Sequence, residues 1–363
     1  MPTMDFLKDF EKEISSLEDV SSSAEPPRFY FSYGNYALNR VMTGNLYNGV
    51  PQGRITAIAG PSHAGKSFVA GNLIRSAQQE NAYCLVIDSE NAFDDDFARN
   101  VGIDTENNYN YKSVLTIPDT ARLVNSFIKG YKKEYNDDSD APKILIVIDS
   151  LDSLFTDSDW ESFHKKGELK ADQGLQSKQL KGMLLKFQQS IKHTNIAMVV
   201  TKQVYRAKAE QILQGEGVWI VNDAIRYPCS QILLITRLKL KDDSKTVVGI
   251  RMKCEGFKTR FTKPFQNVVI EVPYDEGMDP LSGLLELAMA LEVITKKGAR
   301  YVVEGEDKSW YAKDIAEYAP KILSACEKKS TEYIDVGREE EIDSDQGKVS
   351  SRTKRILNLQ GGE

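Results

Sequence analysis

Short apolar strands that alternate with helical stretches predict an α/β fold, in which a mainly parallel sheet is flanked by helices. From about residue 54 onward, runs of apolar residues recur and are bounded by polar or glycine-containing turns. Stretches with helical periodicity separate these runs as far as about residue 200. After residue 230 the strand-like runs follow one another with short turns, which predicts an antiparallel extension of the sheet.

The first 28 residues predict an amphipathic helix on a tether. Segment 4–17 places its apolar side chains on one side of a helix and its charged side chains on the other. These apolar residues are Phe6, Leu7, Phe10, Ile14 and Leu17. Serines and prolines in 21–27 predict a flexible connection. Packing on its own domain and docking on a neighbouring subunit both remain open, and we assign residues 1–28 to assembly.

Residues 29–275 carry the alternating pattern and form the predicted core. The strands expected in its parallel part are 54–59, 83–88, 143–148 and 196–201. The helices expected between and after them are 66–79, 94–101, 119–135 and 173–192. The strand at 143–148 is apolar throughout, as a strand covered on both faces must be.

The last third of the chain changes character. Segments 231–240, 246–253 and 268–273 predict antiparallel strands. A helix at 281–293 and a mixed segment at 299–328 predict a small C-terminal α/β region, 276–332. Residues 333–363 are polar and charged, and we expect a flexible tail there. The fold prediction is therefore a large core with small terminal appendages.

Composition narrows the class of protein. The four cysteines lie far apart, which disfavours a disulfide framework or a zinc ribbon and suits a reducing cytosol. Neither a signal peptide nor an apolar run of membrane-spanning length is present, so we expect a cytoplasmic protein without a membrane partner. The net charge of -6 argues only weakly against nucleic acid, because binding responds to local potential in a loop or groove.

Residues 60–67 fit the phosphate-loop pattern G-x-x-x-x-G-K-S/T at every fixed position. Glycines let backbone N–H groups wrap phosphates, Lys66 supplies charge to the outer phosphates, and Ser67 offers a hydroxyl to Mg²⁺. A chance match in a glycine-rich turn is disfavoured, because a strand precedes the loop and a helix follows it. The sequence predicts ATP and Mg²⁺ as cofactors. The predicted contacts are Gly60, Pro61, Ser62, His63, Ala64, Gly65, Lys66 and Ser67.

Two carboxylates complete the predicted site. Asp149 ends an apolar strand and is placed to hold the water shell of the metal beside Ser67. Glu90 follows the strand after the phosphate-loop helix, where it would orient and polarise the attacking water. A helix-capping or solvated Glu90 is the alternative. The missing L-S-G-G-Q signature before Asp149 disfavours an ABC-type ATPase.

These segments together resemble the RecA family of recombinases, most closely the UvsX recombinases of T-even-like phages. The similarity runs from about residue 38 to residue 310, and segment 279–286 points to the UvsX branch. The resemblance implies a DNA-dependent ATPase that forms right-handed filaments on single-stranded DNA, with ATP between adjacent subunits. It also implies homologous pairing and strand exchange in recombination, repair and recombination-dependent replication. A phage-encoded protein would work in the host cytoplasm.

The resemblance also assigns roles residue by residue. Glu90 matches the catalytic glutamate of the family. Asp94 and Phe97 fall where family members touch adenine, the aromatic ring by stacking. Gln203 matches the polar residue that senses the γ-phosphate and leads into a DNA-binding loop. Lys258 and Arg260 align approximately, across a small gap, with basic residues that reach the neighbour's ATP.

Two segments, 157–172 and 206–222, are placed to meet DNA and are predicted as loops. Lysines and arginines neutralise phosphates, and an aromatic side chain stacks on or wedges between bases. The alternative is a pair of solvated surface loops whose tryptophans pack locally. The second segment departs from the family, which often has a longer glycine run. The predicted DNA contacts are Lys165, Lys166, Lys170, Arg206, Lys208 and Trp219.

The predicted partners are single-stranded DNA, homologous duplex DNA and further copies of the chain, together with a single-strand-binding protein and a loading mediator. A RecA-like mediator or paralogue, which uses ATP as a switch without strand exchange, is the rival function. A hexameric replicative helicase is disfavoured, because the short N-terminus leaves no room for a collar domain. Acidic residues at 339–341 would restrain duplex binding by charge repulsion, as tails of related proteins do.

Overall fold

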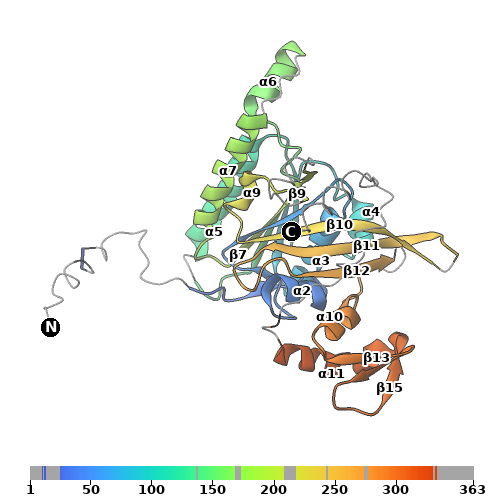
Figure 1. The fold of residues 1–363 in the computed structure, drawn as a ribbon. Coiled ribbons are helices and arrows are strands. Elements are labelled where there is room, and N and C mark those ends of the chain that lie inside the picture. Colours follow the sequence, from blue (N-terminus) through green and yellow to red (C-terminus); the bar gives the residue numbers. More distant parts are fainter. Residues whose placement is uncertain are drawn as a thin grey trace, which may run out of the picture.

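The computed structural model describes residues 10, 12, 13, 25–135, 138–167, 173–207, 218–242, 244–273, 277–329 and 332. An eight-stranded sheet in the order β12-β11-β10-β3-β7-β6-β4-β5 forms its centre (Figure 1). The six strands from β10 to β5 run parallel to one another. Strand β11 pairs antiparallel with β10 on one side and with β12 on the other. This confirms the predicted mixed sheet. Its strands are β3 (Ile55–Gly60), β4 (Tyr83–Asp88), β5 (Tyr109–Ser113), β6 (Ile144–Asp149), β7 (Ile196–Gln203), β10 (Gln231–Lys241), β11 (Val247–Lys258) and β12 (Asn267–Pro273).

Helices cover both faces of this sheet, and two clusters of buried apolar side chains separate the layers. The first cluster lies under α2 (Tyr36–Thr43), α3 (Lys66–Gln79) and α4 (Asp95–Val101). The second cluster lies under α5 (Ile117–Tyr135), α7 (Gln173–Ser190) and the short α9 (Asp223–Arg226). We call these two sides the α3 face and the α7 face.

The carboxyl ends of the parallel strands meet at one edge of the sheet. Gly60 pairs with Gln203, and Asp88 pairs with Asp149, so the last residues of four strands lie at one edge, with the first pair two residues beyond the second in register. In open α/β sheets, ligands bind beyond this edge. The topology therefore brings together residues that lie as much as 143 positions apart in the chain.

Smaller elements surround the core. Strands β1 (Tyr30–Phe31) and β2 (Val50–Pro51) form a two-stranded sheet. The C-terminal part lies below the main sheet in Figure 1 and attaches through the buried Arg40, which donates to the carbonyls of Lys329 and Glu332 at 3.4 and 2.8 Å. Its elements are α10 (Leu284–Ala290), β13 (Ile294–Lys297), β14 (Arg300–Val303), β15 (Ser309–Tyr311), η1 (Ala312–Asp314) and α11 (Ile315–Lys328).

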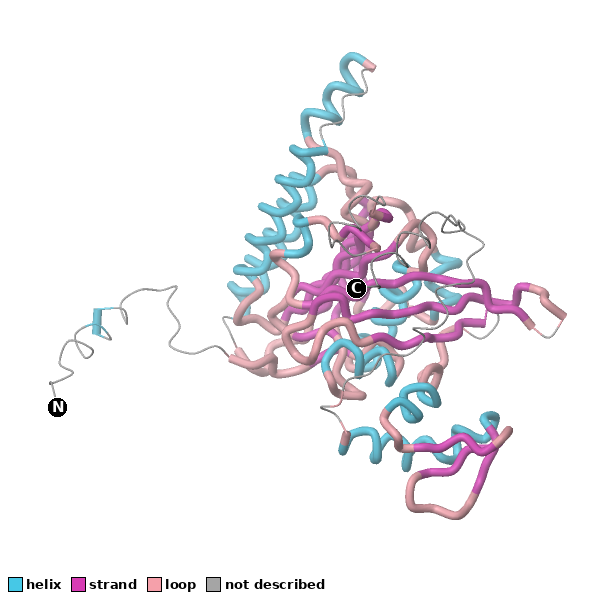
Figure 2. The backbone as a smooth tube through the Cα atoms, viewed as in Figure 1, coloured by secondary structure: helices cyan, strands magenta, loops and turns pink. Residues whose placement is uncertain are grey.

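One predicted loop is a helix instead. Segment 157–172 begins with α6 (Asp157–Lys166), which projects from the molecule together with α7 (Figures 1 and 2). The hydroxyl of Thr156 accepts the N–H of Asp159 as an N-cap, and Gly167 ends the helix with a φ of 66°. Acidic residues in the first turn and basic residues in the last turn suit the helix dipole. Lysines and an aromatic ring suggested a DNA-binding loop, whereas these caps decide the local structure.

Other differences are smaller. Helix α2 and strand β5 are present although the sequence analysis did not predict them. Two short strands lie near the two ends of the second predicted loop, β8 (Tyr205–Arg206) and β9 (Trp219–Ile220). They pair with each other in an antiparallel arrangement. Lys170, Lys208, the tail 333–363 and most of the N-terminal helix lie outside the described residues. Among the described helices, none has the length and apolar character that a membrane span requires.

Candidate nucleotide-binding and catalytic site

The phosphate loop joins the end of β3 to the start of α3, and close packing requires glycine at two of its positions. At position 60 a Cβ would lie 2.5 Å from the carbonyl oxygen of Ile235. At position 65 the φ is 100°, and a Cβ would lie 2.9 Å from the Met252 sulfur. The loop is therefore held against β10 and β11, with the N-terminus of α3 facing the carboxyl edge of the sheet. Within the loop, Ser62 and His63 are exposed, Ala64 is buried, and Pro61 and Ser67 are half-buried.

Lys66 is half-buried at the start of α3. Its ammonium donates to the carbonyl oxygen of Pro61 at 3.1 Å, so it lies across its own loop. Burial lowers the pKa of Lys66, while Asp149, Asp152 and Glu90 favour the charged form. The ammonium lies at the N-terminus of α3, and both the cation and the helix N-terminus favour an incoming anion.

Asp149 lies at the end of β6 and is 1% exposed. Its Oδ1 accepts the hydroxyl of Thr201, and burial raises the pKa of Asp149 while the nearby hydroxyl groups of Thr201 and Ser67 oppose that rise. Its Oδ2 is buried and has no hydrogen-bond partner among the described residues. A buried oxygen without a partner beside a serine hydroxyl fits a hydrated Mg²⁺, so the donor set suits the predicted metal. Thr201 was not singled out from the sequence.

Glu90 follows β4 and is exposed toward the same edge. Its Oε1 accepts two hydroxyl groups, from Ser150 at 2.5 Å and from Ser153 at 2.7 Å. Glu90 is solvent-exposed, as one alternative to a catalytic role supposed, but its carboxylate also accepts these two hydrogen bonds. The geometry holds the carboxylate in one position above the end of β6.

Asp88, which the sequence analysis treated only as the end of a strand, organises the turn that carries Glu90. It is fully buried, and its two oxygens accept the backbone N–H groups of Glu90 at 2.8 Å and of Phe93 at 2.9 Å. The hydroxyl of Tyr111 on β5 reaches Oδ2 at 3.3 Å. A short polar residue two positions before Glu90 is the only sequence signal, and such signals are common.

Gln203 ends β7 beside Gly60, and a second carboxylate fixes its backbone. Asp152 Oδ2 accepts the N–H of Gln203 at 2.5 Å, while Oδ1 forms an ion pair with the ammonium of Lys202. Only 10% of the Lys202 side chain and 18% of the Asp152 side chain are exposed. The sequence analysis missed this pair, because nothing local indicates that residues 50 positions apart meet.

Asp94 and Phe97 lie on the α3 face, at the start of α4. Asp94 is the N-cap of this helix and accepts the N–H of Phe97 at 2.8 Å. The Phe97 ring packs edge-on against Phe93, with centroids 5.1 Å apart, and against Gly71 of α3. Beside them a hollow of about 710 Å³ is lined by Asn91, Phe93, Asp94, Asp95, Thr105, Tyr109, Asn110 and Tyr111. Of the two predicted adenine contacts, Asp94 lines this hollow, whereas Phe97 packs beside it against Phe93.

Lys258 and Arg260 are not brought to this edge. Met252 of β11 lies under the phosphate loop, and Lys258 is six residues further along the strand, about 20 Å away at the usual rise per residue. The Lys258 ammonium donates to the carbonyls of Arg226 at 2.5 Å and of Cys229 at 2.7 Å. Burial lowers the pKa of Lys258, and repulsion from the nearby charge of Arg260 lowers it further. Arg260 is exposed at the same end of the sheet.

The predicted DNA contacts lie around α6 and the β8–β9 hairpin. Lys165 and Lys166 are exposed on α6, and Lys165 pairs with Glu161 at 2.8 Å. Arg206 is exposed and pairs in register with Trp219. The Trp219 side chain is half-buried and packs on the α7 face of the core, as the local-packing alternative supposed.

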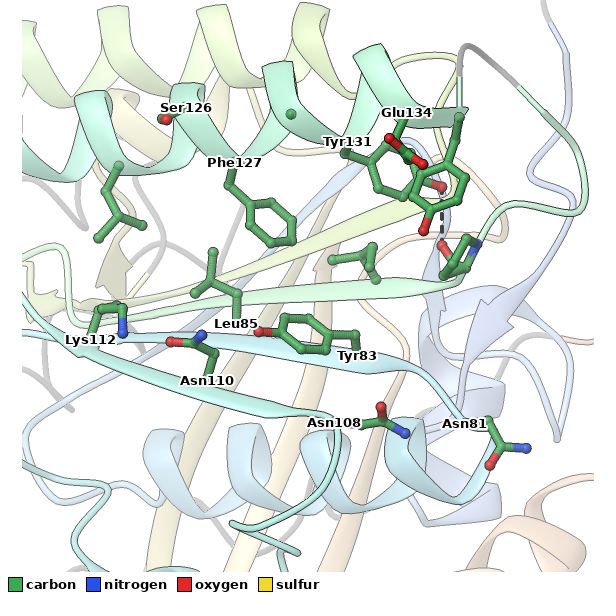
Figure 3. A pocket seen from close by; sticks show the side chains of 15 residues that line it. Asn81, Tyr83, Leu85, Asn108, Asn110, Lys112, Ser126, Phe127, Tyr131 and Glu134 are labelled. Carbon is green, nitrogen blue, oxygen red and sulfur yellow. Dashed lines mark hydrogen bonds between the residues drawn. The ribbon is translucent and has the colours of Figure 1, made fainter.

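A second, larger hollow lies away from this edge. It is a groove of about 770 Å³ on the α7 face, between α5 and strands β4 and β5. In Figure 3 the rings of Tyr83, Phe127 and Tyr131 line the groove, with Leu85 on the sheet below. Because the phosphate loop and α3 belong to the other face, this groove is separate from the nucleotide site.

A phosphate loop between a buried strand and a helix, at the carboxyl edge of a mainly parallel sheet, defines the class of α/β nucleotide-binding proteins. Comparison with known proteins narrows this class. Residues 8–279 match the family model "RecA N-terminal domain". The chain therefore belongs to the RecA family.

Three relatives named "Protein RecA" show how far this similarity extends. That of Sulfurovum sp. is 26% identical over 308 residues, 84% of this chain and 83% of the relative. The proteins of Bartonella bacilliformis and Acholeplasma laidlawii are each 26% identical over 337 and 330 residues. These alignments cover 89% of this chain in both cases, and 92% and 93% of the relatives.

Proposed function

We propose that this protein is an ATP-dependent DNA recombinase that forms filaments on single-stranded DNA and promotes homologous pairing and strand exchange. The observation that carries the proposal is the row of Gly60, Asp149 and Gln203 at one edge of the sheet, with Glu90 above it, in a chain of the RecA family. The proposed setting is recombination, repair and recombination-dependent replication in the cytoplasm.

The proposed chemistry is ATP hydrolysis at this edge. Lys66 and the N–H groups of the phosphate loop would bind the outer phosphates, and Gln203 would contact the γ-phosphate. Glu90 would orient the attacking water and polarise it. Ser67 and Asp149 would hold Mg²⁺, which supplies neutralising charge to the phosphates when it is bound. Asp94 and Phe97 would contact adenine at the neighbouring hollow.

The proposed assembly places each ATP between two subunits. Lys258 lies six residues along β11 from Met252, which contacts the phosphate loop, and Arg260 lies two residues further on. Both residues would therefore act at the ATP site of a neighbouring subunit. A head-to-tail contact of this kind repeats into a ring or an open helix. The N-terminal segment with Phe6 and Leu7 would help to join neighbours. Phe10, which the structure describes, is 49% exposed.

The proposed DNA contacts are the exposed lysines of α6 and the segment that follows β8. Lys165, Lys166 and Lys170 would meet phosphates from one side, and Arg206 and Lys208 from the other. Trp219 packs on the core at the base of the second segment, so its proposed role is to position the segment. A single-strand-binding protein and a loading mediator are the further partners that we propose.

A RecA-like mediator that uses ATP as a switch is the second candidate. A pure switch is able to lose its catalytic carboxylate and its γ-phosphate sensor, whereas this chain has both Glu90 and Gln203. This observation favours the hydrolysing recombinase. Within the family we place the chain nearest the UvsX branch, because of segment 279–286.

The test is ATP turnover measured with and without single-stranded DNA, with electron microscopy of the same samples and a strand-exchange assay. A recombinase shows DNA-stimulated turnover, helical filaments and exchange of homologous strands. Filaments and ATP binding without turnover or strand exchange would identify the mediator instead. Absence of nucleotide binding would refute both candidates.

A further inference from the structure

One short turn contacts both the predicted catalytic carboxylate and the predicted γ-phosphate sensor. Residues 150–153 form this turn after β6, and we call it the serine turn. The hydroxyl groups of Ser150 and Ser153 donate to Glu90, and between them Asp152 binds the N–H of Gln203. The two residues that would face the γ-phosphate are therefore held by the same four-residue segment.

The two hydroxyl groups restrict what Glu90 is able to do. Both donate to the same oxygen, Oε1, at 2.5 and 2.7 Å. A carboxylate oxygen accepts hydrogen bonds through two lone pairs, so the serines occupy this oxygen. A water that needs this oxygen must displace one of them. One oxygen of the Glu90 carboxylate is thus engaged by the serine turn, which sets the orientation of the side chain.

The serine turn is also tied to the helix that projects with α6. The side-chain amide of Gln176, in the first turn of α7, donates to the carbonyls of Asp152 at 3.3 Å and of Leu154 at 2.8 Å. Helices α6 and α7 project together (Figure 1). Helix α6 carries the exposed Lys165 and Lys166. A displacement of α7 would pull on the turn through its backbone.

Asp152 and Lys202 give the turn a rigid base. Their ion pair lies at the end of β7 and is largely removed from solvent. Lys202 belongs to the α7 face, because its neighbours in alternation, Met198 and Val200, lie in that cluster. Because successive side chains in a strand alternate between faces, Gln203 belongs to the α3 face, beside Gly60 of the phosphate loop. Asp152 therefore links the two faces of the sheet.

We propose that the serine turn is a latch on the ATPase site, in which Ser150 and Ser153 are positioning residues that hold Glu90 away from the attacking water until DNA engages α6. Gln176 transmits the displacement of the projecting helices to the turn, and Asp152 moves Gln203 with it. This inference rests on the proposed ATPase function and adds a regulatory contact to that site.

The decisive variant is Ser153→Ala. Ser153 is half-exposed, so its loss is expected to leave the fold intact, whereas Ser150 is 2% exposed and also donates its N–H to Ser89. Removal of one of the two donors should raise turnover without DNA by about fivefold, the size of one net hydrogen bond. Turnover with saturating single-stranded DNA should stay near that of the wild type, so the stimulation ratio falls.

Three further variants isolate the hydroxyl and the tie to α7. Ser153→Thr keeps a hydroxyl and should restore the stimulation ratio. Ser126→Ala removes an exposed hydroxyl from α5, far from the site, and should change nothing. Gln176→Leu leaves the serines in place but cuts the tie to α7, so it should lower DNA-stimulated turnover while basal turnover and KM for ATP stay normal. This last variant tests the latch independently if Ser153→Ala does not fold.

The outcomes separate the latch from the proposed function. If Ser153→Ala lowers basal and stimulated turnover alike, and Ser153→Thr restores both, the hydroxyl holds Glu90 in its working position and the latch is overturned. An unchanged stimulation ratio in both Ser153→Ala and Gln176→Leu also overturns it. If the wild type hydrolyses no ATP with or without DNA, the proposed ATPase function itself fails.

Discussion

The carboxyl and amino ends of the parallel strands differ in how their charged side chains are held within one subunit. At the carboxyl end, Asp88, Asp149 and Asp152 each accept hydrogen bonds from a neighbouring strand or turn. At the amino end, Lys258 contacts only backbone carbonyls in the residues that the structure describes, and Arg260 is exposed. The carboxyl end therefore has an ordered set of carboxylates, whereas the amino end has basic side chains, of which Arg260 is exposed to solvent.

We propose that this difference reflects the assembly of two subunits at each ATP site. The carboxyl end has a cation, a proposed metal-binding carboxylate and a candidate for water activation, and the cation Lys66 contacts its own loop at Pro61. Phosphoryl transfer gains from a cation that stabilises charge in the transition state, and a neighbour often supplies it. The amino end carries such cations. The comparison leads to four predictions, in order of decreasing effect.

Lys66→Ala should have the largest effect, because it removes the fixed charge on the outer phosphates. We expect ATP turnover to fall by roughly 100-fold or more, the scale of losing one preorganised electrostatic contact, with loss of ATP-dependent DNA binding. Steady-state turnover and nucleotide titration measure both. Lys129→Ala, an exposed lysine on α5, is the matched control. Turnover at the wild-type rate in Lys66→Ala would show that the phosphate loop does not bind ATP.

Glu90→Gln should separate binding from hydrolysis at the carboxyl end. The amide keeps the shape of the side chain and removes its capacity as a base, so we expect turnover to slow by about 100-fold while ATP binding and filaments persist. Single-turnover hydrolysis and electron microscopy test this. The exposed Glu106→Gln serves as control. A decrease smaller than about threefold would assign water activation to another group.

Lys258→Ala/Arg260→Ala should leave the carboxyl end intact and disable the amino end. We expect near-normal ATP affinity in the isolated subunit, because neither side chain lies at its own phosphate loop. DNA-stimulated turnover and cooperative assembly should be lost, as measured by turnover against protein concentration. Lys313→Ala/Lys328→Ala removes two exposed charges from the C-terminal part as control. Cooperative filaments with full stimulated turnover would exclude the proposed role across the subunit interface.

Replacement of Lys165, Lys166, Arg206 and Lys208 by Ala should have the smallest effect on the nucleotide site itself. We expect weaker binding to single-stranded DNA and a salt dependence flattened by roughly 0.7 for each phosphate that is no longer neutralised. Basal ATP turnover should not change. Fluorescence titrations over a range of salt concentrations measure the slope. The same slope and affinity as the wild type would place the DNA site outside both segments.

Local patterns in the sequence were enough for the sheet and for much of the candidate site. The apolar run in β6, buried along its whole length, predicted an interior strand. The phosphate-loop pattern predicted a strand before Gly60 and a helix from Lys66, and both are present. These features depend on residues close together in the chain, so periodicity and turn chemistry reveal them. Helix α6 was not predicted, because lysines and aromatic residues are common in DNA-binding loops, whereas the caps at Thr156 and Gly167 determine the helix.

Only the tertiary structure decided which side chains meet across the sheet. The pair of Asp152 with Lys202 and the serine contacts of Glu90 join residues 50 to 63 positions apart. Strand order and register create these contacts, and no local pattern records either of them. The same holds for the separation of Lys258 from the phosphate loop, which follows from β11 running antiparallel beside β10. Sequence therefore determined the elements and their chemistry, and packing determined which groups act together, because contact is a property of the folded sheet and not of the chain order.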